Sequence, residues 1–178
     1  MSVFWRLGYD GAGIAELEQA TGLGRQSLYG AFGDKRALFG RVVDHYFERV
    51  LRPAFIDVLD APGSARENLE RVFKQWEAAA AAPDFNGCLV GNGVSELGLK
   101  DAELAGVLAH KLELLEAAFV RALTRARRAG EVNATLPVRA TARSLLATAQ
   151  GLAVVARVRR DPAFVRGVVD QSRRLLDL

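Results

Sequence analysis

The chain is poor in the residues that build metal and redox sites. It has one cysteine, Cys88, and two histidines, His45 and His110, in 178 residues. A single thiol excludes an internal disulfide and any zinc site built from several cysteines. No nucleophile elbow, metal-spaced cluster or catalytic lysine motif occurs. We therefore expect no catalytic residues, no metal and no cofactor; an enzyme with an unrecognised helical site is the weakest alternative.

The chain also lacks a long uncharged segment. The longest, residues 144–156, has 13 residues, whereas a membrane-spanning helix needs about 20. The N-terminus has no cationic start followed by an apolar core, so no signal peptide is readable. Half of the residues are hydrophobic, too many for a disordered chain. These patterns predict a folded cytoplasmic protein with no membrane partner.

Strands are missing from the pattern, because no Val–Ile–Thr segment alternates in polarity and breakers separate segments of helical length. Gly22 ends a short helix, Asp34 stands at the N-cap of a longer one, and Pro53 is expected to kink or divide that longer helix. Apolar residues recur at helical spacing over 104–122 and 138–156. The prediction is an all-α protein of about nine helices, the first three short.

Two short helices joined by Gly22-Leu23-Gly24 occupy residues 14–32. This geometry suits a helix-turn-helix, whose second helix projects into the major groove of DNA. Leu17 and Leu28 are predicted to pack the two helices together, and Leu23 to fill the turn. The predicted DNA-contacting residues are Arg25, Gln26, Ser27, Tyr29 and Gly30, with Lys35 in the next helix. Gln pairs with adenine and Arg with guanine, while hydroxyls and cations hold phosphates.

This segment resembles the DNA-binding domain of TetR/AcrR-type bacterial transcriptional regulators. The matching elements are Gly8-Tyr9, Ala20 to Gly24, Ser27-Leu28-Tyr29, and Phe32 to Lys35 followed by Leu38. Gly13 replaces the usual Ser or Thr cap, which is a departure. The family's first helix also begins further upstream of Phe4-Trp5. We therefore expect a shortened, frayed first helix and weak operator binding.

The resemblance implies two domains, a helix-turn-helix domain at 1–44 and an effector-binding and dimerisation domain at 45–178. The implied function is a homodimeric repressor that a small-molecule effector releases from a palindromic double-stranded DNA operator. The alternative, from a different class, is a helical homodimer that binds a small molecule without competent DNA binding. The net charge of +3 does not decide between them.

The resemblance also places an effector pocket among helices at about 64–130 and a dimer interface on the last two helices. Apolar residues with a few polar anchors are typical of small-molecule sites. The pocket candidates are Phe73, Trp76, Phe85, Leu89, Asn92, Glu96, Leu112, Glu116 and Phe119. The interface candidates are Val138, Ala142, Leu145, Ala149, Leu152, Val165, Val168, Ser172 and Leu175. Cys88 is interpreted as a small buried residue, with a redox sensor as the alternative.

Overall fold

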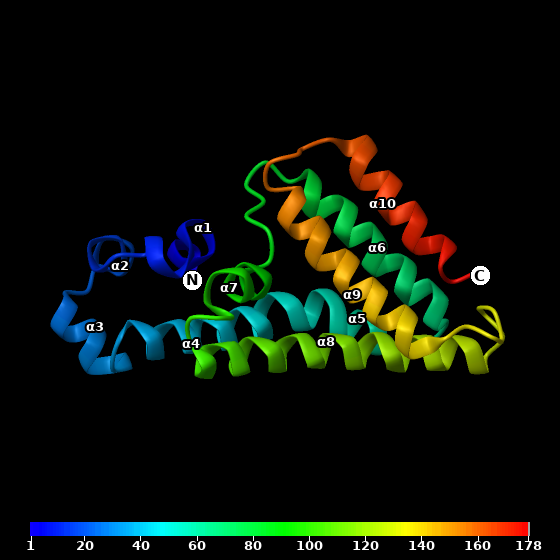
Figure 1. Ribbon diagram of the computed structural model, residues 1–178, viewed down its shortest axis with the longest axis horizontal. Coiled ribbons are helices and arrows are strands. Elements are labelled where there is room, and N and C mark those ends of the chain that lie inside the picture. The colour runs from blue at the N-terminus through cyan, green and yellow to red at the C-terminus, as the bar shows by residue number, and fades with distance from the viewer. Residues whose placement is uncertain (178) are drawn as a thin grey trace.

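The computed structural model describes residues 1–177, and the regular structure in that part of the chain is helical (Figure 1). One continuous helix is made of α4 (Lys35–Tyr46), the π-helical segment η1 (Phe47–Ile56) and α5 (Asp57–Asp60). The other helices are α1 (Ser2–Gly11), α2 (Ile14–Thr21), α3 (Arg25–Phe32), α6 (Ala65–Ala81), α7 (Leu89–Leu97), α8 (Ala102–Arg128), α9 (Val138–Val155) and α10 (Pro162–Arg174). Residues 1–177 thus form nine helices, which confirms the predicted all-α class. No helix within that range is both long and apolar enough to cross a membrane.

The predicted helix ends are confirmed. The Asp34 carboxylate accepts a 2.7 Å hydrogen bond from the Ala37 N–H. Gly22 ends α2 in the left-handed conformation, with φ at +70°. Pro53 does not divide its helix, because the chain passes it as the π-helical segment η1 and continues into α5.

The core lies where α6, α8 and α9 pack together beside the helix of residues 35–60. In Figure 1, α8 runs along the length of the molecule next to α4 and α5, and α6, α9 and α10 cover one half of it. α1, α2 and α3 lie toward the opposite end. Large side chains fill the centre, among them Phe47, Leu69, Phe73, Leu108 and Phe119, all fully buried.

The predicted interface stripe of α9 lies in the core instead of on the surface. Ala142 and Leu145 are fully buried and Leu152 is 5% exposed, within a helix that packs on α8 and α6. Val138 and Ala149 are half-buried against the same core. Ala142, Leu145 and Leu152 are therefore not available to a partner chain, because an apolar stripe shows that a helix face is covered, not which partner covers it.

The α10 candidates divide in the same way. Val165 and Ser172 are buried inside the chain, whereas Val168 and Leu175 are half-buried. Val168, Ser172 and Leu175 line a shallow groove that also includes Thr148 of α9. On α9, the exposed side carries Ala147, Gly151 and Val154.

Candidate nucleic-acid interface and cavity

α2 and α3 form the helix-turn-helix at one end of the molecule (Figure 1). Leu17 and Leu28 are buried, as predicted. Leu23 is 44% exposed, so it does not fill the turn. Polar contacts hold the turn instead: Thr21 Oγ1 accepts from the Leu23 N–H at 3.2 Å, and the Glu18 carboxylate accepts from the Arg25 N–H at 2.6 Å. The second contact pairs the N–H of the first residue of α3, which has no partner within the helix.

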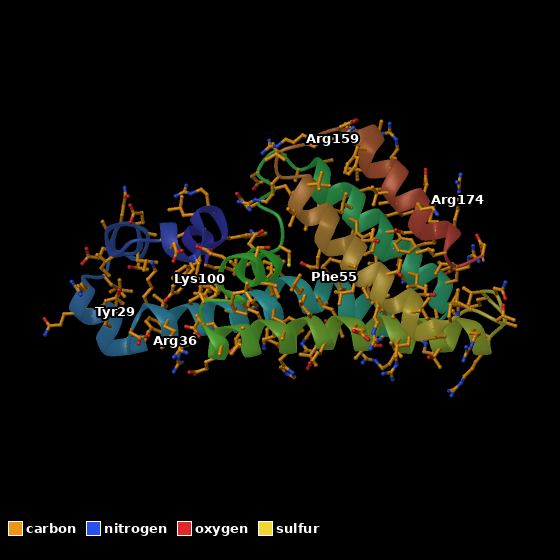
Figure 2. All side chains as sticks on the ribbon, in the orientation of Figure 1. Tyr29, Arg36, Phe55, Lys100, Arg159 and Arg174 are labelled. Atoms are coloured by element: carbon orange, nitrogen blue, oxygen red, sulfur yellow. The ribbon has the colours of Figure 1, made fainter. Side chains whose placement is uncertain are left out.

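The predicted DNA-contacting residues lie together on α3 and the first turn of α4. Arg25, Gln26, Ser27 and Gly30 are exposed, and Tyr29 is half-buried. The Arg25 guanidinium lies over the Tyr29 ring, 5.8 Å from its centroid. Figure 2 shows Tyr29 at the end of the molecule opposite α10. Lys35 is half-buried, with its Nζ 4.8 Å from the centroid of the Tyr9 ring.

Glu96 holds α1 in place instead of lining a pocket. Its carboxylate accepts hydrogen bonds from the Tyr9 and Asp10 N–H groups, both at 2.7 Å. Those donors are free because Gly8, at φ +76°, interrupts the helix just before them. A Cβ on Gly8 would lie 2.7 Å from Glu96 Oε2, so only glycine allows this approach.

Two further ion pairs join the N-terminal helices to the segment after α7. Lys100 Nζ lies 2.9 Å from an Asp10 carboxylate oxygen, and Figure 2 shows Lys100 between α1 and the rest of the chain. Arg36 donates two hydrogen bonds to Asp101, at 2.6 and 2.8 Å. Sequence reasoning missed these contacts, because 65 to 90 residues separate the partners and no local pattern connects them.

A cavity of about 870 Å³ opens between α1, the helix of residues 35–60, α6, α8 and α9. Its aromatic lining consists of Trp5, Tyr46, Phe55, Trp76, Phe85 and Phe119. Trp76, Phe85 and Phe119 were pocket candidates. Trp5, Tyr46 and Phe55 were missed because they lie before residue 64; Figure 2 marks Phe55 in the middle of the molecule.

The other six pocket candidates lie outside the lining. Phe73 and Leu89 are buried in the core, and Leu112 is half-buried against it. Asn92 donates to the Asn86 carbonyl at 3.0 Å, and Glu116 pairs with Arg143 at 3.0 Å. The three polar candidates, Asn92, Glu96 and Glu116, thus lie outside the cavity lining, and each has a partner within the chain.

The buried part of the cavity wall is uncharged. The charged side chains of the lining, Arg6 and Asp84, are both exposed. Burial raises the pKa of the Cys88 thiol and the pKa of the Tyr46 hydroxyl, so both groups are neutral at pH 7. Cys88 is 7% exposed, in keeping with a small buried residue and not with a low-pKa sensor.

Comparison with known proteins agrees with this geometry. Residues 1–42 match the family model "Bacterial regulatory proteins, tetR family", and residues 63–171 match "Tetracyclin repressor-like, C-terminal domain". The HTH-type transcriptional regulator YezE of Bacillus subtilis is 34% identical over 99% of this chain and 92% of its own. The HTH-type transcriptional repressor ComR of Escherichia coli is 26% identical over 88% of this chain and 75% of its own.

Solved structures show the same likeness. A cysteine mutant of the regulator CifR, solved with 26 bp double-strand operator DNA, is 30% identical with a TM-score of 0.80. That match covers 97% of this chain and 90% of CifR. A regulator from Cytophaga hutchinsonii shares the fold at 20% identity and a TM-score of 0.84, over 98% of this chain and 87% of its own. The chain therefore belongs to the TetR family, whose members are DNA-binding transcriptional regulators and not enzymes.

Proposed function

We propose that this protein is a homodimeric repressor that a small molecule releases from a near-palindromic operator. The observation that carries the proposal is the shared wall of the cavity. Trp5 belongs to α1, beside the helix-turn-helix, yet it lines the cavity together with residues of α6, α8 and α9. Family membership favours this function over a helical dimer without DNA binding.

The contacts of Trp5 explain how the cavity would influence the DNA-binding end. Its indole Nε1 donates to the Gly87 carbonyl at 2.9 Å, and its ring packs edge-on against Tyr46 at 5.1 Å. Gly87 is also in the lining and stands shortly before α7, whose Glu96 holds the second half of α1. A ligand shifts the balance of conformations by its difference in affinity between them. Occupancy that moves this wall would therefore move α1, and α2 and α3 with it.

The domain division that we propose, 1–44 and 45–178, falls inside the continuous helix of residues 35–60. That helix carries Lys35 at one end and the cavity residues Tyr46, Val50 and Phe55 further along. It is thus a rigid connection between the DNA-binding surface and the cavity. We propose that it transmits the ligand-induced shift in parallel with α7.

The homodimer is proposed to form through the open faces of α9 and α10. Small and apolar residues occupy that face of α9, including Ala147, Gly151 and Val154. A Cβ on Gly151 or on Gly167 of α10 would meet nothing within 4 Å, so a second chain can approach closely there. Twofold symmetry would then set two α3 helices about 34–36 Å apart, one turn of DNA.

The proposed DNA contacts are tested by selecting bound sequences from a random DNA pool. Gln26→Ala should relax the preference at one position in each half-site, at a cost of about 1–3 kcal/mol. Lys35→Ala should weaken binding to all sequences alike and lower the salt slope by about one. Tyr29→Phe, which removes only the hydroxyl group, should also weaken binding to all sequences alike. Unchanged base preference in Gln26→Ala would refute the assignment of α3.

The proposed dimer is tested with substitutions at two exposed helical glycines that have open space around them. Gly151→Arg, on the proposed interface, should give a monomer by light scattering and reduce operator affinity. Gly106→Arg on α8 is the matched control, because its Cβ would also meet nothing within 4 Å. A dimer that survives Gly151→Arg would place the interface on another surface.

A further inference from the structure

Small side chains on three helices leave the space of the cavity open. The lining includes Ala79 and Ala80 of α6, Ala149 and Ala153 of α9, and Ala54 of the helix of residues 35–60. Because an alanine side chain ends at Cβ, none of these residues reaches across the cavity. Protein interiors are normally close-packed, so an opening of about 870 Å³ between packed helices has room for a small organic molecule.

Aromatic rings border this space on opposite sides. Trp76 of α6 packs against Phe119 of α8, with ring centroids 6.3 Å apart. Trp5 of α1 packs edge-on against Tyr46 at 5.1 Å, and all four residues are in the lining. Contacts between rings add to the stabilisation that burial of apolar surface provides. The wall therefore favours an aromatic molecule.

Several polar atoms of the lining residues are not available to such a molecule. Trp5 Nε1 donates to the Gly87 carbonyl at 2.9 Å. Trp76 Nε1, Gln75 Oε1 and Gln150 Oε1 are enclosed by protein atoms, so they do not face the open space. The molecule would thus be held mainly by apolar contacts.

The wall also disfavours charge. The charged side chains that line the cavity, Arg6 and Asp84, are both exposed. Burial lowers the pKa of the Met1 amino group and raises the pKa of the Tyr46 hydroxyl and of the Cys88 thiol, so the neutral form is favoured in each case. An ionic group placed among the rings would lose its hydration without gaining a buried partner of opposite charge.

Building on the proposed function, we infer that the cavity binds an uncharged aromatic molecule of low polarity, which packs among these rings. Its affinity comes from the burial of apolar surface and from ring contacts. A charged group attached to the same aromatic body lowers the affinity, because the wall has no buried charge to pair with it.

The first test compares N-phenyl-1-naphthylamine with 8-anilino-1-naphthalenesulfonate, which adds a sulfonate to the same aromatic body. Equilibrium dialysis of the full chain without DNA should give an affinity for the uncharged probe at least about tenfold above that for the anion. As competitors of N-phenyl-1-naphthylamine, 1-ethylnaphthalene should bind at least about tenfold more tightly than 1-naphthylmethylammonium, in which an ammonium group replaces the terminal methyl group. Because both tryptophans, Trp5 and Trp76, line the cavity, their emission should fall as the uncharged probe binds.

The second test fills the cavity. Ala149→Phe on α9 and Ala79→Phe on α6 each place a ring in the space that the alanine leaves open. Each should lower the affinity for N-phenyl-1-naphthylamine about tenfold or more, with circular dichroism and melting curves to show that the variant is folded. Ala78→Phe is the matched control, because Ala78 is exposed, precedes Ala79 on α6 and is not part of the lining. It should bind the probe like the parent chain.

The inference is overturned if no uncharged probe binds up to its solubility limit, or if either ion binds as tightly as its uncharged counterpart. It is also overturned if both filled variants bind N-phenyl-1-naphthylamine like the parent chain. Release of operator DNA is measured separately. Selective binding of the uncharged probes without release would contradict the proposed repressor function and leave the inference standing.

Discussion

The DNA-binding end and the cavity-bearing part of the molecule differ in how many residues their helices bury and in how those helices are capped. α2 and α3 each bury one residue, Leu17 and Leu28 respectively, whereas α6 buries seven and α8 buries eight. α2 and α3 begin at glycines with no side-chain cap, but Ser64 and Asp101 cap α6 and α8 through side-chain hydrogen bonds. Few buried contacts give low local stability. The DNA-binding end is therefore the part of the molecule most easily displaced.

The attachment of that end to the rest of the chain has the same character. Phe4 packs edge-on against Phe39 at 5.2 Å, and this aromatic contact is supplemented by polar ones at Glu96, Lys100 and Gly87. Short polar contacts can be broken and remade at lower cost than a packed core can be rearranged. The helix-turn-helix of α2 and α3, called the reading head below, is thus held less firmly than the cavity-bearing helices such as α6, α8 and α9, called the rigid body below. Four substitutions test this difference.

The largest effect is expected from Leu145→Arg. Leu145 is fully buried in α9, which packs on α8 and α6, so the substitution places an unpaired charge in the rigid body. Such a change costs about 5 kcal/mol or more, enough to unfold a typical domain. Circular dichroism should show loss of helix throughout the chain. Val154→Arg, at a position 47% exposed on the same helix, is the control and should retain the helical signal.

The second change, Leu28→Ala, should affect the reading head alone. Truncating this buried leucine costs about 2–5 kcal/mol in a packed site, and Leu28 is the buried residue of α3. Hydrogen exchange should accelerate in α2 and α3 while the amides of α6 and α8 keep their protection. Operator binding should be lost and binding in the cavity kept. Simultaneous loss of protection in both parts would mean that they unfold as one unit, contrary to the comparison.

The sequence predicted the reading head better than the cavity, and the reason is physical. Leu17, Gly22, Leu28 and the Asp34 cap all lie within one segment of 18 residues, so spacing alone reveals them. The cavity is assembled from α1, the helix of residues 35–60, α6, α8 and α9, and no local period shows which of their faces meet. The same limit misplaced the α9 stripe, where apolar spacing correctly predicted burial but not the partner.

Glu96 illustrates the limit most clearly. The sequence placed it among the polar candidates for the effector pocket. The structure instead pairs its carboxylate with the N–H groups of Tyr9 and Asp10. A sequence pattern can identify a polar residue on a largely apolar helix, but it cannot identify a backbone donor 87 residues away. Gly8, a glycine inside a segment of helical length, was the one local sign of an interruption there.

The third change, Glu96→Ala, should weaken the contact by which α7 holds α1. It removes two hydrogen bonds to a charged acceptor, the part-buried one from the Tyr9 N–H and the exposed one from the Asp10 N–H, at a cost of about 1–3 kcal/mol. Exchange of the Tyr9 and Asp10 amides should accelerate, and operator affinity should change while the helices of the rigid body keep their protection. Glu103→Ala is the control, because this carboxylate is 77% exposed and contacts only a side chain, that of Arg36. Unchanged exchange at Tyr9 and Asp10 would show that the carboxylate does not hold α1.

The smallest effect is expected at the ion pair between Arg36 of α4 and Asp101, the N-cap residue of α8. The Arg36 guanidinium, helped by the Leu104 N–H, lowers the pKa of Asp101 from its usual 3.8 to about 2. A carboxylate whose pKa is lower in the folded state stabilises the fold above pH 3.8, and that contribution disappears as the pH falls toward 2. The Arg36 side chain is 42% exposed, so solvent screening keeps the effect small.

Asp101→Asn retains a good N-cap residue and should lower the melting temperature by no more than about 2–4 °C at pH 7. Melting curves of the two proteins should converge between pH 4 and pH 2, and a difference that persists at pH 2 would mean that the ion pair is not its source.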